Sequence, residues 1–171
     1  FVEVPTQDTE PIAFHSHTGK DGSPQLSERD AFALGAGGRF LEQDTLTANF
    51  STTSASFQDI TGLSITKDIH NKRVLLLFSG CISSNADGGG AYLTFDLDGT
   101  NQGGASGMAF FQQTRAVGAG QLVAPFTMAF VTDILTGSHT FKVQLASDGT
   151  NTAYIWANSL KAAFVAIELT D

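Results

Sequence analysis

Strict alternation of apolar and polar residues marks two segments of the chain as half-buried β-strands. In residues 91–98, AYLTFDLD, the odd-numbered positions are apolar and the even-numbered ones are Tyr, Thr and Asp. Residues 139–146, HTFKVQLA, alternate in the same way, with Phe141, Val143 and Leu145 on one side. Because successive side chains of a strand point to opposite faces, each segment presents an apolar face to a core and a polar face to solvent.

Three other strand-like segments are apolar on both faces. They are residues 73–82 (RVLLLFSGCI), 121–131 (QLVAPFTMAFV) and 161–169 (KAAFVAIEL). In a two-layer sandwich only one face of a sheet meets the core, so the second apolar face needs another cover. We expect copies of the same chain to supply that cover. The alternative is that loops or the N-terminal residues fold over these strands.

Short apolar segments and turns alternate at intervals of roughly ten residues from Thr45 onward, which is typical of an antiparallel sandwich or barrel. Asp-Gly turns at 97–101 (LDGTN) and 147–151 (SDGTN) each follow a strand. We therefore predict an all-β, antiparallel β-sandwich domain over residues 45–171. Its predicted strands are residues 46–50, 54–60, 63–67, 72–82, 91–98, 107–113, 121–131, 138–146, 151–157 and 161–169.

The first 44 residues have a different pattern. Residues 1–26 contain three of the four prolines and show neither a period of 2 nor one of 3.6. We predict an extended N-terminal arm over residues 1–44 that lies on another surface. A short helix is predicted within it, beginning at Ser27 with a capping Asp30 and ending at Gly35.

Charge and hydropathy exclude two classes of partner. The formal net charge is −8, and no cluster of Lys or Arg interrupts it, so a nucleic-acid partner is not expected. No apolar stretch approaches the roughly 18 residues that cross a bilayer, so membrane insertion is not expected either. The lone Cys81 lies inside an apolar run and is predicted to pack as a small hydrophobic residue.

Two histidines separated by one residue form a candidate metal site. In an extended segment His15 and His17 would present both imidazoles on one side. A closed transition-metal site needs at least four ligands, so the others would have to come from symmetry-related chains or from Asp21. The alternative is a plain turn with exposed histidines.

No catalytic motif accompanies these histidines. The sequence contains neither a G-x-S-x-G elbow nor an H-E-x-x-H helix, so we predict that the protein is not an enzyme. Asp96 and Asp98 share one strand face before a turn, as in some glycosidases and calcium loops, but they are predicted to shape the Asp-Gly turn. His139 shares the parity of Phe141 and is predicted to cap the edge of the core.

Three aromatic side chains are candidates for ligand binding, because sugar sites commonly use an exposed Trp or Tyr as a platform. They are Tyr92, Tyr154 and Trp156, of which the last two share one strand face. If that face is open to solvent, sugar binding is favoured. If it lies at a subunit contact, the pair is structural.

Several segments together resemble the jelly-roll modules of bacteriophage tail fibres, head fibres and decoration proteins. These segments are TLTANFSTTSASFQDITGLSIT, KRVLLLFSGCIS, YLTFDLDGT, HTFKVQLAS and AAFVAIEL, and the resemblance covers about residues 45–171. It implies a ten-stranded jelly roll similar to C1q and tumour-necrosis-factor heads, assembled as a homotrimer with the final strand near the threefold axis. It also implies that a His-x-His from each of three chains, here His15 and His17, ligates one structural metal ion.

The resemblance implies a virion protein of a tailed phage, with the arm docked on a neighbouring virion protein and the head displayed outward. Gly-rich loops at 83–90, 99–107 and 114–120 are suited to recognition but specify no receptor, and a host-surface glycan is a candidate partner. Two other hypotheses come from different classes. One is a secreted carbohydrate-binding module or adhesin, which a glycan array would support; the other is a metal-dependent hydrolase, which loss of turnover in His15→Ala would support.

Overall fold

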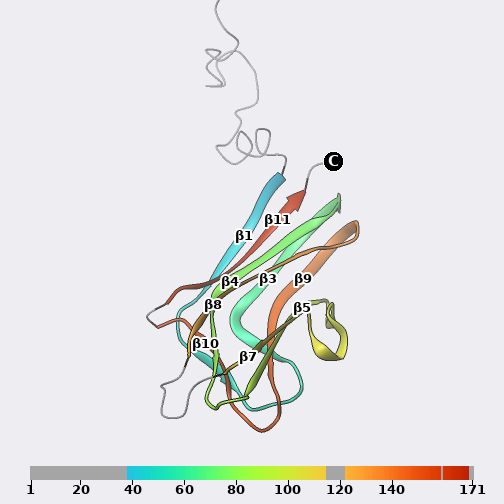
Figure 1. Cartoon of the computed structure of the whole chain (residues 1–171). Helices are drawn as coiled ribbons and strands as arrows, with labels where there is room; N and C mark the ends of the chain where they lie inside the picture. Colours follow the sequence, from blue (N-terminus) through green and yellow to red (C-terminus); the bar gives the residue numbers. More distant parts are fainter. Residues whose placement is uncertain (1–37, 115–121, 159, 170–171) are drawn as a thin grey trace, which may run out of the picture.

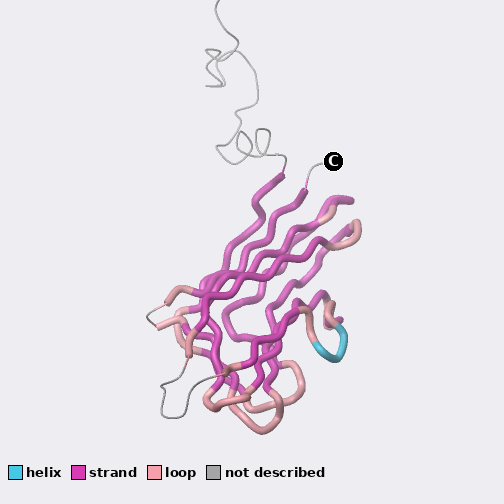
Figure 2. The backbone as a smooth tube through the Cα atoms, in the orientation of Figure 1, coloured by secondary structure: helices cyan, strands magenta, loops and turns pink. Residues whose placement is uncertain are grey.

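The computed structural model describes residues 38–114, 122–158 and 160–169 as two antiparallel β-sheets packed face to face (Figures 1 and 2). The predicted all-β antiparallel sandwich is confirmed. Apart from the strands, the described residues contain one short 3-10 helix, η2 (Gly104–Ser106). The predicted helix from Ser27 lies outside the described residues, as does most of the loop at 114–120.

The first sheet contains six strands: β1 (Gly38–Leu46), β2 (Phe50–Thr52), β4 (Val74–Ser84), β8 (Ala124–Val131), β10 (Ala153–Trp156) and β11 (Ala162–Leu169). The second contains five: β3 (Gln58–Lys72), β5 (Gly90–Leu97), β6 (Thr100–Asn101), β7 (Ala109–Gln112) and β9 (Leu135–Ser147). All pairings between neighbouring strands are antiparallel.

Three pairs of strands, β1 with β2, β6 with β7 and β10 with β11, each act as one interrupted strand. β10 and β11 both pair with β4, β1 and β2 pair with β11 and β10, and β6 and β7 both pair with β5. If each pair counts as one strand, the chain has eight strands. Numbered 1 to 8 along the chain, independently of the β labels, they are ordered 1-8-3-6 in the first sheet and 2-7-4-5 in the second. This is the strand order of a jelly roll, in which the chain wraps two sheets as a pair of Greek keys.

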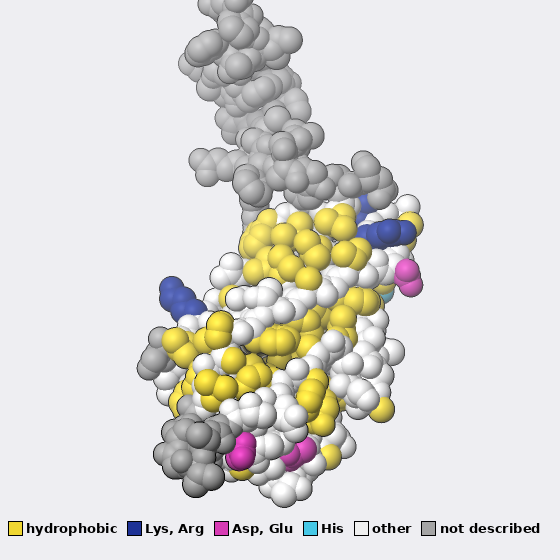
Figure 3. All heavy atoms as spheres, in the orientation of Figure 1, with side chains coloured by type: hydrophobic (Ala, Val, Ile, Leu, Met, Phe, Trp, Pro, Cys, Tyr) yellow, Lys and Arg dark blue, Asp and Glu magenta, His cyan; other side chains and the backbone are white. Residues whose placement is uncertain are grey.

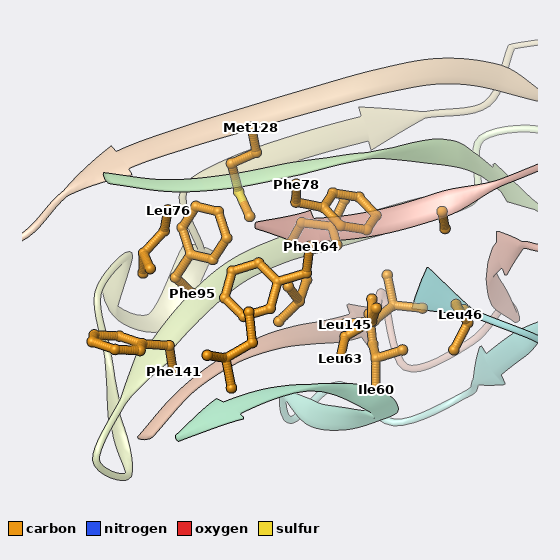
Figure 4. Packing of buried hydrophobic residues seen from close by; sticks show 14 of the residues in the cluster. Leu46, Ile60, Leu63, Leu76, Phe78, Phe95, Met128, Phe141, Leu145 and Phe164 are labelled. Atoms are coloured by element: carbon orange, nitrogen blue, oxygen red, sulfur yellow. The ribbon is translucent and has the colours of Figure 1, made fainter. Parts of the chain in front are cut away.

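The core fills the space between the two sheets with alternate side chains from each strand. On β4 the inward positions are Val74, Leu76 and Phe78, all fully buried. Phe95 from β5 meets Phe164 from β11 across the sandwich, with 5.7 Å between ring centroids (Figure 4). The strands predicted from alternation therefore turn their apolar faces toward each other, which removes those side chains from water.

Two predicted boundaries differ from the structure because of bulges. The sandwich begins at Gly38 rather than near Thr45, since β1 pairs with β11 along its whole length and a register shift between Phe40 and Glu42 breaks its alternation. The strand predicted at 63–67 and the last residues, 58–60, of the one predicted at 54–60 belong to a single long β3. Gly62, with φ of +92°, lies where the register of β3 shifts. The sequence pattern therefore predicts a turn where the structure has a β-bulge.

The three strands predicted to be apolar on both faces lie side by side in the first sheet. β4 pairs with β11 on one side and with β8 on the other. Their inward faces join the core, and their second faces point away from the sandwich. Figure 3 shows apolar side chains gathered on the surface over the β1, β11 and β4 end of this sheet.

Candidate ligand-binding pocket and outer apolar face

Cross-strand register aligns the second apolar faces into continuous rows. One row runs from Phe40 through Ile167 and Leu75 to Val131. A second row runs from Val165 through Leu77 to Ala129. We call the residues of these two rows the outer apolar face.

Solvent reaches the two edges of this face. Phe40 is 38% exposed and Val131 45% exposed, and the Leu and Ile side chains between them are half-buried against each other. Within the described residues no loop covers either row. The alternative in which the N-terminal residues cover the face concerns residues 1–37, which are outside the described part.

Tyr154 and Trp156 share one strand face, as predicted, and that face continues the outer side of the first sheet. Their rings are stacked, with centroids 5.8 Å apart. Trp156 Nε1 donates a hydrogen bond to Ser83 Oγ at 2.7 Å, and Trp156 pairs with Cys81 across to β4. Both side chains are half-buried, and neither belongs to the two rows of the outer apolar face.

Tyr92 lies on the other sheet, so the three predicted aromatic residues do not form one site. It points outward from β5, beside Ala146 of β9 and Phe110 of β7. The ring of Tyr92 packs against that of Phe110 at a centroid distance of 4.7 Å. Tyr92 also lines a pocket of about 260 Å³ on the outer side of the second sheet.

This pocket, called here the Tyr92 pocket, is built from a strand floor and two loop walls. Tyr92 and Ala146 face each other across β5 and β9, and the walls come from the segment before β3 and from η2. Its lining residues are Ala55, Phe57, Tyr92, Ala105, Ser106, Ala146, Ser147 and Asp148. Among them, the sequence predicts Tyr92 as a candidate side chain and the loop at 99–107, which contains Ala105 and Ser106, as a candidate recognition loop.

The η2 wall is held in place by close backbone contacts. Gly107 has φ of +71°, and a Cβ on it would lie 2.8 Å from Phe57 Cζ and 2.7 Å from the Leu93 carbonyl oxygen. Glycine is therefore required for the loop to lie this close to the ring and to β5. Asn101 Oδ1 accepts hydrogen bonds from the Gly103 N–H and the Thr94 hydroxyl, each at 2.7 Å, which ties the start of the loop to the strand.

Asp148, at the edge of the pocket, organises the SDGTN turn and ties it to β5. Its two oxygens accept four hydrogen bonds, from the N–H groups of Gly90, Thr150 and Asn151 and from the Asn151 side-chain amide. The Asn151 amide and these backbone donors hold the pKa of the Asp148 carboxyl well below its usual value of 3.8, against a smaller opposing effect of burial. The carboxylate is therefore a fixed negative charge.

Asp148→Asn is expected to destabilise the fold by about 1–3 kcal/mol at pH 7, because an amide NH₂ would replace an acceptor that faces N–H donors. A carboxyl whose folded-state pKa is lowered stabilises the fold above its unfolded pKa, and this contribution is lost as pH falls through the folded value. The difference in unfolding free energy between wild type and variant should therefore become smaller below about pH 3.8. Urea unfolding at pH 7 and at low pH measures it. Asp133→Asn, at an exposed loop position, should show no such difference.

The turn after β5 has a structural role, as predicted for its two carboxylates. Asp96 is buried and accepts a hydrogen bond from the Gly99 N–H at 3.0 Å. Asp98 accepts one from the Thr140 N–H at 2.8 Å and contacts His139 Nδ1 at 2.6 Å. His139 Nε2 lies 3.2 Å from the Thr136 carbonyl oxygen. The Nδ1 contact holds the turn to β9, whereas the Nε2 contact is made within β9 itself.

The predicted metal ligands His15 and His17 lie outside the described residues, so the site stays a prediction. Within residues 38–114, 122–158 and 160–169, no group of three His, Cys, Asp or Glu side chains is placed to hold a metal ion. No helix in that part of the chain has the length and apolar character needed to cross a membrane.

Comparison with known proteins gives similarities of structure only. No protein family and no curated protein matches the sequence. The fold is similar to part of latent PorU from Porphyromonas gingivalis, at 10% identity and a TM-score of 0.38, over 87% of this chain and 15% of that one.

It is also similar to the VP2 subviral particle protein of infectious bursal disease virus, at 13% identity and a TM-score of 0.39, over 78% of this chain and 42% of that one. The protein of the T=1 particles derived from that virus gives 14% identity and a TM-score of 0.36, over 75% and 40% of the two chains. The chain therefore spans less than half the length of these structures. At such scores the similarities carry no functional argument.

Proposed function

We propose that the chain is a structural, non-enzymatic virion protein of a tailed phage, a head decoration, head-fibre or tail-fibre module. It forms a homotrimer through the outer apolar face and displays the second sheet outward. The observation that carries the self-association is the pair of apolar rows across β1, β11, β4 and β8.

General magnitudes set what self-association through this face requires. A standard protein contact hides about 800 Å² per partner. Burying apolar area contributes roughly 25 cal/mol per Å², and association itself costs an estimated 4–15 kcal/mol. Two adjacent rows that include Leu75, Leu77, Val165 and Ile167 provide the apolar centre that such a contact needs.

Trimerisation is supported by the position of the last strand. The sequence resemblance to phage-fibre modules implies a final strand near a threefold axis. β11 lies between β1 and β4, in the middle of the outer apolar face. The jelly-roll strand order agrees with that resemblance, but the fold alone serves many functions, so the assignment to a virion rests on the sequence. Docking through the N-terminal arm is part of the same proposal.

Mass spectrometry of purified phage particles tests the virion assignment. The proposal expects the chain at a fixed copy number per particle, in a multiple of three. Its absence from particles that infect normally, with the chain free in the medium, would contradict the assignment.

A secreted carbohydrate-binding module or adhesin is the second candidate. The Tyr92 pocket favours it, because a preformed hollow with an aromatic lining and hydroxyl groups is what a small sugar site requires. Sugar binding is compatible with either location. The particle measurement therefore separates the two candidates, and a binding measurement alone does not.

A further inference from the structure

We propose that the Tyr92 pocket binds a single neutral sugar ring, of the hexose or N-acetylhexosamine class, as found at the exposed end of a surface glycan. This inference specifies the ligand of the glycan contact in the proposed function. It rests on the proposed function only for the direction in which the pocket is displayed.

The location of the pocket leaves it accessible in the assembly. It opens on the outer side of the second sheet, between the segment before β3 and η2. The outer apolar face belongs to the first sheet, on the opposite side of the sandwich. A trimer formed through the first sheet therefore keeps the pocket exposed to solvent.

The size of the pocket limits the ligand to one ring. Sites for drug-sized ligands occupy about 300–1,000 Å³. The Tyr92 pocket, at about 260 Å³, falls just below that range. Because Gly107 and Phe57 pack against each other and Asn101 anchors the loop, the walls are already formed without a ligand.

The lining combines apolar carbon surface with hydroxyl groups. A sugar ring needs both, because it presents C–H groups as well as hydroxyl groups. Phe57 and Ala146 supply carbon atoms for the C–H groups of a sugar ring. Among the described residues, neither the Tyr92 hydroxyl nor the Ser106 hydroxyl has a hydrogen-bond partner. Each hydroxyl can donate one hydrogen bond and accept others, which suits the hydroxyl groups of a sugar.

Asp148 determines which sugars are excluded. Its oxygens already accept four hydrogen bonds from the protein, so it contributes charge to the pocket rather than a further acceptor. A fixed negative charge at the rim repels carboxylate and phosphate groups. Sialic acids, uronic acids and phosphorylated sugars are thus disfavoured by repulsion, and neutral rings are accepted.

The test is a titration of the full-length chain followed by backbone amide NMR. The probes are glucose, galactose, mannose, N-acetylglucosamine and N-acetylgalactosamine, with N-acetylneuraminic acid and glucuronic acid as anionic counterparts. One sugar ring in a pocket of this size should bind with a dissociation constant in the low millimolar range, so each probe is taken to about 50 mM. At least one neutral probe should shift the amides of residues 55–57, 105–107 and 146–148, and the anionic probes should leave them unmoved.

Two variants connect the shifts to the pocket. Ser106→Trp places a large side chain at an exposed wall position and should weaken binding at least tenfold. Ser138→Trp makes the same change at an exposed, outward-facing position toward the other end of β9 and should leave binding unchanged. Tyr92→Phe removes one hydroxyl and should weaken binding roughly 2- to 10-fold. Thermal unfolding of each variant establishes that the sandwich is intact.

Binding of a neutral probe that Ser106→Trp abolishes and Ser138→Trp preserves supports the proposal. It is overturned if no neutral probe moves the pocket amides at 50 mM, or if Ser106→Trp binds as wild type does. Stronger binding of an anionic probe overturns the assignment to neutral sugars. None of these outcomes depends on whether the chain is found in phage particles, so the pocket and the virion assignment can fail separately.

Discussion

Leu77→Glu is expected to convert the proposed trimer into single chains while each sandwich stays folded. Leu77 lies between Val165 and Ala129 in the second row of the outer apolar face and is only half-buried in a single chain. In the assembly its replacement would bury an unpaired carboxylate at the centre of each contact. A loss of about 2–4 kcal/mol per contact is expected, which lowers the association constant by roughly 30- to 1,000-fold.

Phe110→Glu is the matched control for this variant. Phe110 is 50% exposed on β7 in the second sheet, away from the outer apolar face. The same kind of substitution there should leave the oligomeric state unchanged. If folded Leu77→Glu sediments as wild type does, the contact between chains is made by some other surface.

Phe164→Ala is expected to cost about 3–5 kcal/mol of unfolding free energy, a large part of the roughly 5–15 kcal/mol that a domain has. Phe164 is fully buried on β11, and its ring is stacked on that of Phe95 from the facing sheet (Figure 4). Truncation removes this contact and leaves a cavity that the two rigid sheets cannot close. Denaturant unfolding at equal protein concentration measures the loss, since the stability of an oligomer depends on concentration.

Phe110→Ala provides the comparison for the core variant. Among the described residues the half-exposed ring packs against Tyr92, and half of its surface is already in water, so its removal should cost clearly less than that of the fully buried Phe164. A cost at Phe164 as small as the cost at Phe110 would mean that the two sheets do not pack through these rings.

The fold class could be predicted from the sequence because the alternation of residues 91–98 and 139–146 is a local property. β1 was missed for a local reason as well: the bulge after Phe40 shifts its pattern by one residue. Gly62 produced the opposite error and divided β3 in two. Where the backbone departs from a period of 2, pattern reasoning assigns the wrong boundary.

The alignment of the apolar rows could be predicted only in part. The sequence shows that β4, β8 and β11 each carry a second apolar face, but their adjacency depends on long-range pairing. The Tyr92 pocket shows the same limit. Strand parity identifies Tyr92, whereas Phe57, Ser106 and Asp148 come from three separate loops. The sequence predicts the SDGTN turn, but it does not predict that this turn lies beside β5.

Sedimentation equilibrium of the wild-type chain tests most directly whether the outer apolar face is covered by copies of the same chain. At micromolar concentration we expect a particle with three times the 18.0 kDa mass of the chain. A monodisperse species with the mass of one chain at that concentration would contradict self-association through this face.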